Sequence, residues 1–96
     1  MLKSLAAAIG SASIAAAVVA SAEPPAGAAS CSGCHPTSAR VTSPVPRLTG
    51  LDRAAIVKAF QEFRSGKRPA TVMDRISKGF TDAEIQAIAA WYATQR

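Results

Sequence analysis

The chain has 96 residues and a mass of 9.8 kDa, which leaves room for one small domain. Apolar residues make up 49% of it, and 11 Lys and Arg against 6 Asp and Glu give a net charge of +5. This composition excludes a multidomain protein, a collagen-like repeat and a long disordered chain. The basic residues are scattered and lack interleaved aromatic side chains, so we expect no nucleic-acid partner.

The N-terminal segment, residues 1–22, has the pattern of a cleaved signal peptide. Lys3 is the only charge before Glu23, the residues between them are small and apolar, and ASA at 20–22 forms an A-x-A cleavage site. Ala, Ser and Gly dominate the segment, which makes a permanent anchor helix the weaker alternative. The sequence predicts export to the bacterial periplasm, no stable membrane span after cleavage, and a working domain over residues 23–96.

The first helix of that domain is predicted over residues 26–34, with Pro25 able to occupy its first position. Residues 36–50 carry three prolines and several hydroxyl side chains, so they are predicted to form a loop.

The second helix is predicted to be capped by Asp52 and to run to about Ser65, where Gly66 ends it. Its apolar residues recur with helical spacing, at Ile56, Val57, Phe60 and Phe63.

The C-terminal part of the chain begins with a second connection over residues 67–80, with a short turn around 73–77. A last helix opens at a capping box over 81–84 and runs to about Thr94. No stretch alternates as a strand would, so the fold class is all-α: three to four short helices and long loops. A domain of roughly 70 residues buries too little surface to be stable without a disulfide, a metal or a cofactor, so the loops are expected to wrap around a large apolar cofactor. Candidate side chains for the core or the cofactor pocket are Leu48, Leu51, Phe60, Phe63, Ile76 and Ile88.

The chemistry of the chain concentrates in the sequence CSGCH at residues 31–35, which holds both cysteines and the single histidine. Cys31, Cys34 and His35 share one helical face within a turn. Two thiols at this spacing can form thioethers with the two vinyl groups of one haem edge, and the adjacent imidazole can ligate the iron. The motif therefore predicts one covalently bound haem c.

Other uses of these residues stay open from the motif alone. A thiol–disulfide oxidoreductase also uses Cys-x-x-Cys, but in a strand–helix unit that this chain lacks. A structural zinc site needs four ligands, and Cys31, Cys34 and His35 supply three. A plain disulfide would close a very small loop and stabilise little. The haem-free alternative is thus a small thiol redox or structural module.

A haem iron bound by His35 needs a sixth ligand or an open site. Met73 is the only methionine after Met1 and lies 38 residues beyond His35, in the second long connection. A core position is the usual use of a lone methionine, but here the loop can carry it over the opposite haem face. A thioether ligand raises the reduction potential. Since six-coordinate iron leaves no substrate site, the sequence predicts electron transfer and not an enzyme.

The chain resembles a class I c-type cytochrome over nearly all of residues 26–93. CSGCH at 31–35 is similar to the haem-attachment motif of that family, and PRLTG at 46–50 is similar to its P-x-L-x-G segment. The resemblance implies that the carbonyl of Pro46 accepts a hydrogen bond from the imidazole of His35 and thereby orients the ring.

The distal half is especially similar to the small cytochrome subunit of flavocytochrome c sulfide dehydrogenases, in SGKRPATVM at 65–73 and RISKGFTDAEI at 75–85. The resemblance implies a redox partner protein, a flavoprotein sulfide dehydrogenase subunit that donates electrons. A free periplasmic carrier serving an oxidase or reductase is the alternative. Arg75 is the preferred partner for a haem propionate, and the alternative is that it is a solvated surface cation. Trp91 and Tyr92 are expected to pack across the first helix.

Overall fold

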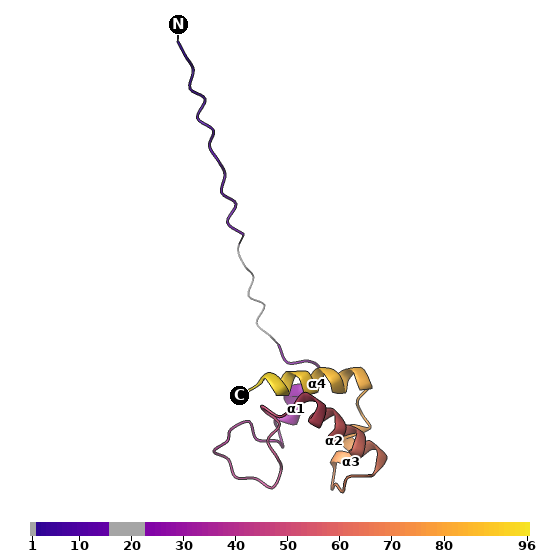
Figure 1. The fold of residues 1–96 in the computed structure, drawn as a ribbon. Coiled ribbons are helices and arrows are strands. Elements are labelled where there is room, and N and C mark those ends of the chain that lie inside the picture. Colours follow the sequence, from indigo (N-terminus) through magenta and orange to yellow (C-terminus); the bar gives the residue numbers. More distant parts are fainter. Residues whose placement is uncertain (1, 16–22) are drawn as a thin grey trace.

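The computed structural model describes residues 2–15 and 23–96 (Figure 1). Residues 2–15 contain no helix or strand, and their large apolar side chains are exposed. The predicted cleavage site at 20–22 lies outside the described residues. Across the two described ranges, no helix combines the length and apolar character needed to cross a bilayer.

The domain consists of four helices: α1 (Ala28–Cys31), α2 (Arg53–Ser65), α3 (Met73–Ser77) and α4 (Asp82–Thr94). Over the same described ranges there is no strand, so the all-α prediction is confirmed. α4 packs against both α1 and α2, and α3 packs against α2 (Figure 1). The loop between α1 and α2 projects from one end of this helix group (Figure 1).

α1 is much shorter than the predicted helix over 26–34. Gly27 precedes it with φ +86°, a left-handed conformation that cannot continue a helix, so Pro25 does not occupy the first helical position. Beyond Cys31 the chain continues as hydrogen-bonded turns and not as helix. The physical reasons are the low helix propensity of Gly33 and the constraint that Pro36 places on the residue before it.

The ends of α2 and α4 agree with the predicted caps. The carboxylate of Asp52 accepts a hydrogen bond from the amide of Ala55, and Gly66 ends α2 with φ +77°. At the start of α4, the hydroxyl of Thr81 accepts from the Glu84 amide, and the Glu84 carboxylate accepts from the Thr81 amide. These caps satisfy backbone groups that a helix leaves without partners, which explains why the boundaries follow the sequence.

The core lies where α1, α2 and α4 meet. The Tyr92 hydroxyl donates a 2.5 Å hydrogen bond to the carbonyl of Ala28, which joins α4 to α1 as expected for the aromatic pair. The rings of Phe60 and Phe80 pack edge to face, with their centroids 6.2 Å apart. Two of the candidates for core or cofactor pocket, Leu51 and Ile76, are 42% and 43% exposed and so do not belong to the core. The buried apolar side chains are Ala28, Ile56, Phe60, Ile85, Ile88, Ala89 and Tyr92.

Candidate cofactor site

The two cysteines lie at the end of α1 and in the turn that follows it, and both are free thiols. Cys31 is half-buried against the core, and its thiol donates to the carbonyl of Gly27 at 3.5 Å. Burial raises the pKa of the Cys31 thiol above its ordinary value. Cys34 is exposed. One sulfur is therefore seated against the helices, and the other faces solvent.

His35 is oriented from two sides. Its amide donates to the carbonyl of Cys31 at 2.9 Å, which holds the backbone in the turn after α1. Its ring nitrogen Nδ1 lies 2.5 Å from the carbonyl oxygen of Pro46. Because a carbonyl can only accept, Nδ1 carries the hydrogen and the lone pair sits on Nε2. The imidazole thus has the tautomer that a metal-ligating histidine needs.

Met73 is the first residue of α3, and its half-buried side chain packs against the core cluster. The N-cap of the short helix that carries it is Val72, whose carbonyl accepts from the amides of Arg75 and Ile76 at 3.0 Å. Arg75 is exposed, and among the described residues its side chain makes no hydrogen bond or ion pair. Its role toward a haem propionate stays a prediction.

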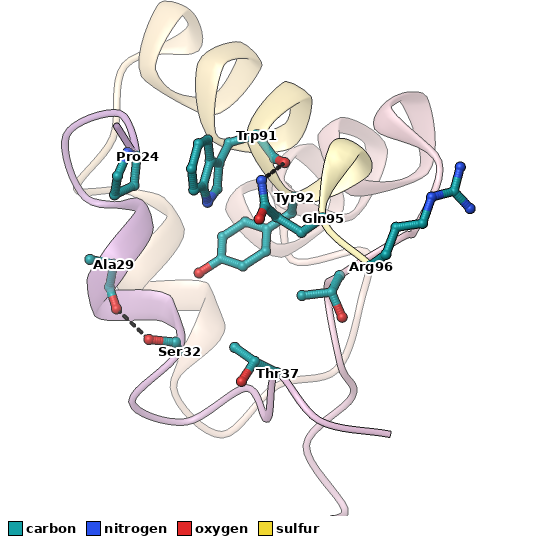
Figure 2. Close-up of a pocket in the computed structure, with 9 residues that line it drawn as sticks. Pro24, Ala29, Ser32, Thr37, Trp91, Tyr92, Gln95 and Arg96 are labelled. Carbon is teal, nitrogen blue, oxygen red and sulfur yellow. Dashed lines mark hydrogen bonds between the residues drawn. The ribbon is translucent and has the colours of Figure 1, made fainter. Parts of the chain in front are cut away.

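A cavity of about 380 Å³ lies elsewhere, between α1 and the C-terminal end of α4 (Figure 2). Trp91 and Tyr92 point into it from α4, and Ala29 and Ser32 border it from α1 and the turn beyond (Figure 2). None of the two cysteines, the histidine or the methionine of the candidate site lines it. The cavity lies on the α1–α4 contact and is therefore not part of the candidate cofactor site.

The donor set fits a covalently held haem. It comprises two reduced thiols, an imidazole with Nε2 available and a thioether on a separate helix. Two large apolar side chains close to Met73 in the chain are exposed: Val72 at 52% and Ile76 at 43%. An apolar macrocycle is the kind of group that such side chains cover. Within residues 2–15 and 23–96, no three His, Cys, Asp or Glu side chains gather into a metal-binding cluster.

Comparison with known proteins identifies the family. The chain is 40% identical over 63 residues to the cytochrome subunit of sulfide dehydrogenase from Chlorobaculum tepidum, covering 66% of this chain and 57% of that protein. It is 32% identical over 69 residues to cytochrome c-554(548) from Halomonas halodenitrificans, covering 68% and 83%. It is 35% identical over 65 residues to the thiosulfate dehydrogenase electron acceptor of Stutzerimonas stutzeri, covering 66% and 30%. No protein-family model matches the chain.

The chain belongs to the c-type cytochromes, and its all-α fold is that of the class I members. The c-type cytochromes transfer electrons on a haem that is covalently attached to the chain. The chain spans only 57% of the sulfide dehydrogenase subunit that it matches.

One residue that sequence reasoning missed is Arg64, at the end of α2. Its guanidinium bonds to Ser77, Phe80 and Asp82, all in the segment that follows Met73. These partners lie 13 to 18 positions away, so neither helical spacing nor a motif could reveal them. From the sequence alone, Arg64 is an ordinary basic residue in the last turn of a helix.

Proposed function

We propose that the protein carries single electrons in the bacterial periplasm on one haem c, held by Cys31 and Cys34 through thioether bonds. His35, through Nε2, and Met73, through its sulfur, would be the two protein ligands of the haem iron. The observation that carries the proposal is the contact between the His35 ring and the Pro46 carbonyl, because it leaves Nε2 free to bind iron.

The chain's own residues prepare the site for electron transfer. When bound, the haem supplies an iron that alternates between the ferric and ferrous states. Cys31 and Cys34 would together hold one edge of the haem, and because Cys34 is exposed, that edge would lie near solvent, where a partner can approach. The half-buried thioether of Met73 favours the ferrous state, which raises the reduction potential.

Export completes the proposal. Residues 1–22 are proposed to be removed as a signal peptide, leaving residues 23–96 as the cytochrome domain.

The proposed partner is a flavoprotein sulfide dehydrogenase subunit that donates electrons to this cytochrome. The support is the 40% identity to the cytochrome subunit of sulfide dehydrogenase. A second candidate is a free periplasmic carrier, supported by the fact that the chain covers 83% of cytochrome c-554(548). Affinity purification of the exported cytochrome from its native periplasm separates the two. A stoichiometric flavin-containing protein supports the subunit, and a monomeric cytochrome without flavin supports the free carrier.

The ligand assignment is tested by Met73→Ala, with Val72→Ala as the matched control on the adjacent residue. In the ferric wild type, the long-wavelength absorption band of methionine-bound haem is expected. Met73→Ala should abolish this band, lower the reduction potential and let added imidazole bind without competition. Val72→Ala should retain the band. A Met73→Ala protein with the wild-type spectrum and potential would contradict the assignment.

A further inference from the structure

The side chain of Arg64 ties the last turn of α2 to the segment between α3 and α4. Its Nε donates to the carbonyl of Ser77 at 2.9 Å, and its Nη2 donates to the carbonyl of Phe80. Its Nη1 donates to the carboxylate of Asp82 at 2.6 Å. All three guanidinium nitrogens are therefore bonded to one short stretch of chain. A planar fork of this kind holds its acceptors in a fixed geometry.

The Ser77 carbonyl is the acceptor that connects Arg64 to the candidate ligand. Ser77 is the last residue of α3 and is fully buried, and Met73 is the first residue of the same five-residue helix. The N-cap of α3, Val72, provides no side-chain hydrogen bond. So short a helix has little stability of its own and depends on contacts from outside. Arg64 supplies a charged contact at the buried end of α3.

The ion pair with Asp82 is the weaker part of this arrangement. The Asp82 side chain is 89% exposed, whereas that of Arg64 is 26% exposed. Exposed ion pairs add little to stability, whereas a charged donor to a buried carbonyl adds more. The two carbonyl bonds, and not the ion pair, should therefore hold α3 and the chain beyond it against α2.

We infer that Arg64 is a positioning residue for the axial methionine: by fixing the end of α3, it holds the Met73 thioether at the iron. The inference rests on the proposed His/Met ligation. Without the hydrogen bonds of the Arg64 guanidinium, α3 should separate from α2 more often, and each separation would withdraw Met73 from the metal. An added ligand that binds only the withdrawn state then binds more tightly, in proportion to the population of that state.

The test is an imidazole titration of the ferric holoprotein, followed by the long-wavelength methionine band. Arg64→Gln, which removes the charge and the fork, should strengthen apparent imidazole binding about tenfold, the effect expected from losing about one charged hydrogen bond. Arg64→Lys retains one charged donor and should fall between Arg64→Gln and the wild type. Asp82→Asn removes the ion pair alone and should stay within about twofold of the wild type.

Arg68→Ala is the matched control for general destabilisation. Arg68 pairs with Glu62 at 3.1 Å and stacks on the Phe63 ring at 5.5 Å, so it stabilises the end of α2 without touching α3. The Arg68→Ala protein should bind imidazole with the affinity of the wild type, even if its urea midpoint is lower.

The outcomes distinguish this inference from the proposed function. Equal imidazole affinities for Arg64→Gln and Arg68→Ala, in a protein that shows the methionine band, overturn the role of Arg64 alone. A wild type without the band overturns both the ligand assignment and this inference. If Arg64→Gln yields no folded holoprotein, Arg64→Lys decides: tighter imidazole binding than in Arg68→Ala supports the role, and equal binding overturns it.

Discussion

The carbonyl oxygen of Pro46 lies 2.5 Å from Nδ1 of His35, eleven positions earlier in the chain. This contact joins the turn after α1 to the far end of the loop that precedes α2. It fixes the ring orientation and the tautomer together, since the carbonyl requires a hydrogen on Nδ1. A hydrogen bond from Nδ1 also makes Nε2 a stronger electron donor to a bound metal.

Replacing Pro46 by alanine should raise the reduction potential. The carbonyl remains in the variant, but its position is no longer held by the proline ring, so the bond to His35 weakens and the imidazole donates less to ferric iron. Spectroelectrochemistry on the holoprotein measures the shift. Pro44→Ala is the control, because Pro44 lies in the same loop and its carbonyl does not contact His35. An equal potential for Pro46→Ala and Pro44→Ala would contradict this role.

Gly27→Ala should destabilise the holoprotein by about 2–4 kcal/mol. Gly27 has φ +86°, and a Cβ there would lie 2.5 Å from Cε1 of Phe80. The variant therefore carries both backbone strain and a steric clash at the α1 end of the core. Gly66→Ala has a similar φ of +77° with no atom within 4 Å of the new Cβ, so it should cost only about 1–2 kcal/mol. Urea unfolding that gives equal losses would show that the Phe80 contact is unimportant.

The capping box of α4 should make stability depend on pH. Hydrogen bonds from the backbone amide and then the hydroxyl of Thr81 hold the pKa of the Glu84 carboxyl below its ordinary value of 4.5. A lowered folded-state pKa stabilises the protein above pH 4.5, and this contribution is lost as the pH falls through the folded-state pKa.

The variant Glu84→Gln isolates this contribution. Its urea midpoint should lie below that of the wild type at neutral pH, and the two should converge as the pH falls below the folded-state pKa of Glu84. Glu23→Gln, at an exposed carboxylate before α1, is the control and should follow the wild type throughout. A gap between wild type and Glu84→Gln that is the same at every pH would contradict the charge-dependent cap.

The parts of the fold that follow from local chemistry were predictable. Asp52 and Gly66 set the two ends of α2 through contacts within one turn, and the capping box at Thr81 starts α4 in the same way. The burial of Ile88 and Tyr92 on one face of α4 follows from the helical spacing of apolar residues alone. Motif spacing also singled out the candidate thiols and imidazole.

Features that depend on distant parts of the chain were not predictable from patterns. α1 begins later than predicted because Gly27 adopts a left-handed conformation beside Phe80, a neighbour that is distant in sequence. The contact of Arg64 with Ser77 depends on how α2 and α3 pack. Pro46 was anticipated from the family resemblance, because nothing in residue spacing pairs a proline carbonyl with His35.

The most direct test of the account is the alkaline pyridine spectrum of the protein after export with a haem c maturation system. We predict one haem per chain, still attached after acid–acetone extraction, with the band position of a haem whose two vinyl groups are both saturated by the thiols of Cys31 and Cys34. Replacing either cysteine by alanine should shift that band to the position of a singly attached haem. A correctly exported protein that is colourless, or whose haem is fully extracted, would contradict the account.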